Sequence, residues 1–128
     1  MFKFRGQSTL TGEWVTGWHF MDVGLEKHYI VSIGVPNEVH KESLSVSFGK
    51  LDSNKQEIFA SFEIDGVMTT GGDVVELKHI QGKQFKVQYS AIGCEFIMQR
   101  PDSDIVWNVS NAGQFEITII GKGGGNDK

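Results

Sequence analysis

The sequence predicts an all-β domain, built as an antiparallel two-sheet β-sandwich of about eight or nine strands. Apolar and polar residues alternate along most of the chain, as expected for strands whose successive side chains leave opposite faces. Sixteen glycines and only two prolines accompany runs rich in Val, Ile and Phe, which suits sheet and tight turns better than helix. An up-and-down β-barrel satisfies the same pattern and is the alternative.

The clear alternation begins with a strand over residues 13–20. Residues 1–12 hold at most a short edge strand, because glycines and small polar side chains interrupt the pattern there. A second strand is expected over 28–35, ending at Pro36-Asn37, and residues 37–42 leave room for a turn of helix. The strand over 13–20 has one face that is either buried or a binding surface, formed by Trp14, Thr16, Trp18 and Phe20.

A hairpin is expected between residues 43 and 64. In its first strand Ser43, Ser45 and Ser47 point to solvent, and the apolar residues between them point to the core. A turn over 51–55 follows, and Asp65-Gly66 ends the second strand, because glycine readily adopts the positive φ of a tight turn. The residues of the second strand that point inward are Ile58, Ala60, Phe62 and Ile64.

The stretch from Gln84 to Ile120 predicts a β-meander, preceded by a strand over 75–79. Turns are expected at Gly93, at 100–103 and at 110–113, where turn-forming residues gather. The inward side chains of its first strand are Phe85, Val87 and Tyr89. One domain over residues 1–121 is expected, followed by a flexible Gly-rich tail over 122–128 that has no apolar residue to anchor it.

Charge and cysteine content exclude several classes of protein. A net charge of −4 with scattered Lys and Arg argues against a nucleic-acid partner, which needs a clustered basic face. Cys94 is the only cysteine, so no internal disulfide can form. No apolar leader or membrane-spanning run is visible, so we expect a protein made and kept in the cytoplasm of the producing cell unless it is released.

No motif predicts catalysis, a metal or a cofactor. The four histidines, at positions 19, 28, 40 and 79, are isolated, without the spacing of a metal site. No nucleophile elbow or phosphate-binding loop is present. We therefore expect a protein that is not an enzyme.

The aromatic residues are the remaining candidates for a binding site. Trp side chains favour interfaces, because the ring is apolar and its N–H is polar. Trp107 shares its parity with apolar neighbours and is expected in the core. Trp14 and Trp18 lie between glycines and are expected to form a partly exposed cluster.

Two stretches resemble the aegerolysins, small acidic β-sandwich proteins that bind membrane lipids. The first is residues 44–77, with a Phe48-Gly49-Lys50-Leu51 run at a strand end, followed by Glu57, Ile58, Ile64, Gly66 and Gly72. The second combines FKVQY at 85–89 with EFIMQRPDSDIVWNVS at 95–110, and Glu13-Trp14-Val15 is a looser match. Fungal members carry two loop aromatics where this chain has residues 98–102, so the choice of lipid stays open.

The resemblance implies a non-enzymatic protein that binds sphingolipid-rich or sterol-rich membranes. Such proteins often act with a larger pore-forming partner, in pore-forming or insecticidal systems, and self-association is also open. The expected lipid contacts are Trp14, Trp18, Arg100, Pro101 and Asp102.

Two other functions fit the same residues. Leu10-Thr11-Gly12-Glu13-Trp14 is similar to the Gly-x-Trp opening of lipocalin-like and avidin-like barrels, which implies a small ligand held inside a barrel. A sandwich that binds carbohydrate or protein through Trp14 and Trp18 is the third reading.

Overall fold

The computed structural model describes residues 3–47, 49–78, 80–91, 95–100, 106–109 and 117–123. These residues form an all-β fold with a turn of 3-10 helix at Lys41–Ser43, where a helical turn was expected. No helix in the described ranges is long and apolar enough to cross a membrane. The strands are β1 (Lys3–Gln7), β2 (Trp14–Asp22), β3 (Lys27–Ser32), β4 (Val35–Val39), β5 (Ser45–Ser47), β6 (Glu63–Ile64), β7 (Val67–Met68), β8 (Asp73–Leu77), β9 (Ile80–Ser90), β10 (Glu95–Gln99), β11 (Val106–Asn108) and β12 (Ile117–Lys122).

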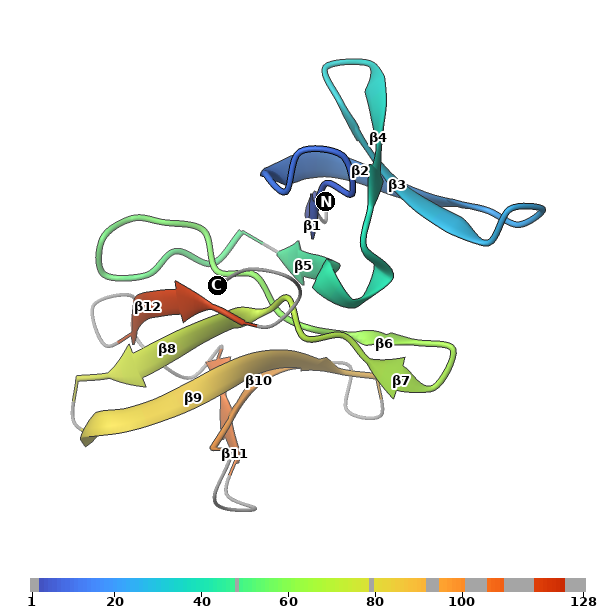
Figure 1. The fold of residues 1–128 in the computed structure, drawn as a ribbon. Helices are drawn as coiled ribbons and strands as arrows, with labels where there is room; N and C mark the ends of the chain where they lie inside the picture. The colour runs from blue at the N-terminus through green and yellow to red at the C-terminus, as the bar shows by residue number, and fades with distance from the viewer. Residues whose placement is uncertain are drawn as a thin grey trace.

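Two antiparallel five-stranded sheets make the sandwich (Figure 1). The first has the order β4-β3-β2-β1-β5 and the second β11-β10-β9-β8-β12, with β6 and β7 as a separate hairpin. The described strands close into no barrel, so the sandwich prediction is confirmed over its alternative. The strand count exceeds the eight or nine expected, because several strands are only two or three residues long.

The core lies between the two sheets. Its main cluster combines residues of β5 and the 58–60 segment with the inner face of the second sheet, including Phe85, Val87, Phe96 and Ile117. Phe85 and Val87 point inward as predicted, and Tyr89 packs against the same cluster. A smaller cluster under the first sheet contains Ile30, Val39 and Leu44.

The segment after β5 belongs to both sheets. Ala60 exchanges backbone hydrogen bonds with Val46 of β5, with N···O distances of 2.8 and 2.9 Å. Ser61 donates its N–H to Val87 of β9 and accepts the N–H of Tyr89. Residues 58–62 therefore join the edge of the first sheet to the centre of the second.

The first sheet curls strongly. The chain after β1 reaches β4, since Thr9 donates its N–H to Glu38 and His40 donates its N–H to Gln7. The backbone of β3 approaches β2 so closely that a Cβ at Gly17 would collide with the carbonyl oxygen of Val31. Glycine at this position is therefore required by space.

The prediction of one strand over 28–35 was wrong. The chain reverses at Ile33-Gly34, where both residues have positive φ, 52° and 74°. Positive φ at both central residues makes the tight turn that suits a hairpin, but a β-branched residue such as Ile rarely adopts it. Ile33 therefore carries no turn signal, and β4 follows as an edge strand that tolerates Pro36.

The prediction that Ser43, Ser45 and Ser47 face solvent was also wrong, because all three are fully buried. The β1 and β5 end of the first sheet is covered on both faces, where the small side chains of these serines fit; Ser43 and Ser47 are hydrogen-bonded there, while the buried Ser45 Oγ has no hydrogen-bond partner. Ser43 Oγ accepts the N–H of Gln7 and donates to the carbonyl of His40, while Ser47 Oγ donates to Glu57. The strand β5 is therefore buried on both faces although it ends the order of its sheet, and period-two patterning cannot identify an outer face there.

The meander prediction holds for β8 to β11 but was wrong for the last strand. β12 pairs with β8 at the opposite edge of the sheet, with Ile119 opposite Val75. Alternation of apolar and polar residues predicts which face of a strand is buried, but it does not predict the strand with which it pairs. The pairing of β12 with β8 could therefore not be predicted from the sequence. β12 continues through Lys122, and the N–H of Gly123 donates to Gly72. Several predictions lie outside the described residues. These are the turns at Gly93 and at 110–113, most of the turn at 100–103, the orientation of Phe48 and of the Trp107 side chain, and the tail over 124–128.

Candidate functional site

The aromatic face of β2 lies on the outside of the first sheet. The opposite face carries Val15 and, on β3, Ile30, and packs on the smaller core cluster. This face was expected to be either buried or a binding surface, and the structure places it at the surface. Trp18 lies opposite Val31, is 56% exposed and remains the most open aromatic side chain of the strand. Phe20, 44% exposed, stacks on Tyr29 with ring centroids 5.0 Å apart.

Trp14 shares this face with Trp18 but is held differently. It lies opposite Gln7 of β1 and is half-buried. The Arg5 guanidinium carbon lies 5.0 Å and the Lys122 ammonium nitrogen 5.9 Å from its ring centroid. Cations over an indole face attract its negative π-cloud, so Trp14 is anchored against the body of the sandwich while Trp18 is not.

The tip of the β2–β3 hairpin is unusually apolar. Met21 precedes the turn, and Val23 and Leu25 lie within it, 75% and 61% exposed. The turn is fixed by Asp22, whose side chain accepts the N–H of Leu25 at 3.1 Å. Figure 1 shows that this hairpin projects away from the two-sheet body. An ordered, apolar, projecting tip is therefore continuous with Trp18 and Phe20.

The structure does not place the predicted lipid-contacting loop as a whole. Arg100 follows β10 in the second sheet and is half-buried, while Pro101 and Asp102 lie outside the described residues. The two tryptophans share one face of β2, and Arg100 belongs to the other sheet. The loop contact therefore stays a prediction.

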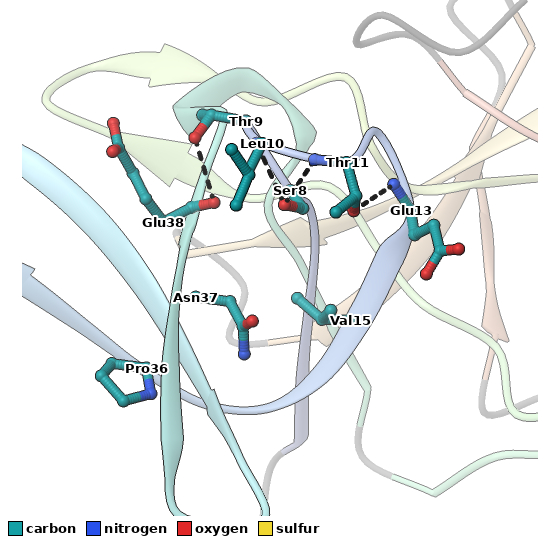
Figure 2. A pocket seen from close by; sticks show the side chains of 9 residues that line it. All are labelled: Ser8, Thr9, Leu10, Thr11, Glu13, Val15, Pro36, Asn37 and Glu38. Carbon is teal, nitrogen blue, oxygen red and sulfur yellow. Dashed lines mark hydrogen bonds between the residues drawn. The ribbon is translucent and has the colours of Figure 1, made fainter.

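A shallow cavity of about 420 Å³ lies between the 8–13 loop and β4 (Figure 2). Most of its hydroxyl groups are already used by the loop itself. Ser8 Oγ accepts the N–H groups of Leu10 and Thr11, and Thr11 Oγ1 accepts that of Glu13. The cavity therefore offers a bound molecule mainly carboxylate oxygens at its rim and the apolar side chains of Leu10, Val15 and Pro36.

A histidine pair lies on the inner face of the same hairpin. The Nε2 atom of His19 and the Nδ1 atom of His28 are 2.9 Å apart, so one proton is shared in a hydrogen bond between them. Burial lowers the pKa of both histidines, the neighbouring His28 lowers that of His19 further, and Lys41 does the same for His28 against an opposing effect of Asp65. The folded protein thus favours the pair with neither ring charged.

Acid is therefore expected to destabilise the fold. The pKa of each histidine is lower in the folded protein than its ordinary value of 6.5. Below that pH the unfolded chain binds more protons, so the stability is lost as pH falls, by at most about 1.4 kcal/mol per pH unit for each histidine. Thermal unfolding between pH 7.5 and 5.5 measures this loss. The His19→Gln, His28→Gln double variant should flatten the slope; a slope equal to that of the unmodified protein would contradict the assignment.

Sequence reasoning missed most of the hairpin's exposed residues. Phe20 was placed on the aromatic face, but Met21, Val23 and Leu25 follow the strand expected over 13–20 and were not named as candidates. A signal was available, because a short turn normally carries polar residues and this one alternates them with apolar ones.

In the described part of the chain, no three His, Cys, Asp or Glu side chains gather as metal ligands would.

Comparison with protein-family models, curated proteins and solved structures finds no match to this chain. The resemblance to the aegerolysins therefore stays a prediction drawn from the quoted residues.

Proposed function

We propose that this protein binds the surface of lipid membranes, without catalysing a reaction, through the β2–β3 hairpin. One observation carries the proposal. Among the described residues, five of the eleven exposed large apolar side chains fall within the eight residues from Trp18 to Leu25. An exposed apolar patch of this kind is typical of a binding surface.

The distribution of these side chains favours a lipid surface over a rigid protein partner. Trp18 and Phe20 leave the outer face of the hairpin, Met21 leaves the inner face, and Val23 and Leu25 occupy the turn. A fluid interface can surround such a tip on all sides, whereas a protein groove would cover one face. Indole and phenyl rings at the base of the tip suit the headgroup region, where apolar and polar contacts coexist.

The charge of the chain bears on the choice of lipid. With a net charge of −4, the protein gains nothing from attraction to anionic headgroups. Neutral membranes rich in sphingolipid or sterol are therefore the proposed target, and the resemblance to the aegerolysins supports the same choice. A larger pore-forming protein that joins after membrane binding is part of this proposal.

Trp18→Ala combined with Leu25→Ser is expected to abolish binding to vesicles of phosphatidylcholine, sphingomyelin and cholesterol. Each substitution removes a large side chain whose burial contributes about 1.5–3 kcal/mol, so the pair should weaken binding at least a hundredfold. Vesicle co-sedimentation measures the loss, with thermal unfolding to show that the fold is kept.

The control is Val67→Ser combined with Ile120→Ser, which removes comparably exposed apolar side chains, 67% and 45%, from other strands. This variant should bind vesicles like the unmodified protein. Equal losses in both variants would contradict the role of the hairpin. Binding to soluble glycans and not to vesicles would favour the carbohydrate-binding alternative instead.

A further inference from the structure

A narrow apolar cleft of about 190 Å³ opens between the two sheets, apart from the exposed hairpin. Four of its five lining side chains carry aromatic rings, and the hydroxyl of Tyr89 is the only polar side-chain group among the five. Its lining comes from both sheets and from the segment between them: Phe4 of β1, Val46 of β5, Phe62, Tyr89 of β9 and Phe96 of β10. Such a lining suits an uncharged apolar guest.

The walls of the cleft are held by the fold. Val46 and Phe96 are buried members of the main core cluster. The rings of Phe4 and Phe62 meet edge to face at 5.9 Å, and those of Tyr89 and Phe96 are tilted at 5.0 Å. The N–H of Phe62 donates to Thr69 Oγ1 at 3.1 Å, which fixes the wall between the sheets. The cleft is therefore preformed, so a guest need not order it on binding.

Its volume limits the size of the guest. An apolar cavity of about 150 Å³ is large enough to bind benzene. The cleft, at about 190 Å³, accepts one ring or a short length of linear hydrocarbon. A sterol nucleus or the paired chains of a phospholipid would exceed it.

The location favours the hydrocarbon chain. The ring of Phe4 lies 5.5 Å from His19, which is on the inner face of β2. The outer side of the same strand carries Trp18, which is proposed to contact lipid. The geometry points to a site that binds the end of one alkyl chain, supplied by a membrane lipid; the choice of a chain over a ring and the source of that chain both rest on the proposed function.

A series of n-alkanols from butanol to dodecanol tests the site in solution by isothermal titration calorimetry, without vesicles. Affinity should rise about fourfold for each added methylene, which corresponds to the transfer of one CH₂ out of water, and level off once the cleft is full. Phe62→Trp places a larger ring in the cleft from a half-buried position and should weaken binding at least tenfold. Phe96→Leu enlarges the cleft and should move the plateau to longer alkanols.

Trp18→Ala is the matched control, because it should weaken vesicle binding and keep alkanol binding. Alkanol binding without any vesicle binding would retain the chain site and remove the membrane as its source. Affinity that does not change with chain length, or that survives Phe62→Trp with the fold intact, would overturn the proposal. Binding of toluene in preference to every alkanol would assign the cleft to a ring, and self-association lost in Phe62→Trp would assign it to a second copy of the chain; either result overturns it.

Discussion

Asp73→Ala is expected to lower the free energy of unfolding by about 3–5 kcal/mol, the usual cost of removing one partner from a buried ion pair. Asp73 and Arg5 form such a pair at 2.9 Å, with only 1% and 8% of their side chains exposed. The other carboxylate oxygen of Asp73 accepts the N–H of Phe59. Burial raises the pKa of the Asp73 carboxyl, and the Arg5 guanidinium opposes that rise.

The substitution leaves the Arg5 guanidinium buried without a counter-charge. Its remaining contacts are the carbonyl of Gly71, at 2.9 Å, and the faces of Phe59 and Trp14. Urea unfolding at pH 7 measures the loss, and Arg5→Met with Asp73→Leu should recover only part of it, because the unpaired charge is removed but the buried N–H of Phe59 still lacks its acceptor. Lys3→Ala is the control, since Lys3 pairs with Glu57 at the surface and should cost less than about 1 kcal/mol. Similar losses for Asp73→Ala and Lys3→Ala would show that the buried pair does not hold the sheets as described.

Gly17→Ala is expected to destabilise the protein by about 3 kcal/mol, at the upper end of the cost of overpacking. The added methyl group would meet the backbone carbonyl of Val31, which cannot move aside as a flexible side chain could. The strands β2 and β3 would have to separate at the base of the hairpin that carries Trp18. Thermal unfolding measures the effect.

The matched control is Gly121→Ala in β12, where a Cβ would have open space. Its φ is not positive, so alanine should be neutral or slightly stabilising, by up to about 1 kcal/mol. If the two variants had the same melting temperature, β2 and β3 would not approach each other as closely as the structure shows.

Local patterns predicted the local structure well and the neighbour relations poorly. Phe85 and Val87 were placed correctly, because a strand with one buried face has a period of two. Ser45 was not, because its strand is buried on both faces and a polar side chain in the pattern does not mark solvent there. β12 was assigned to the wrong neighbour, since pairing depends on residues far away in the sequence.

The candidate site was predicted only in part. Trp18 could be identified because an aromatic face between glycines is visible in the sequence. The different role of Trp14 could not, because it depends on Arg5 and Lys122, which lie on other strands. The Phe4 to Phe96 cleft was equally hidden, since its walls come from segments that only the fold brings together.

The segment 58–62 links the two sheets covalently and by hydrogen bonds, because its backbone bonds to β5 on one side and to β9 on the other. Separating the two sheets would break the backbone hydrogen bonds of Ala60 and Ser61 at the same time. We therefore expect the sheets to separate only when the protein unfolds. Hydrogen exchange at these amides is therefore expected to require global unfolding.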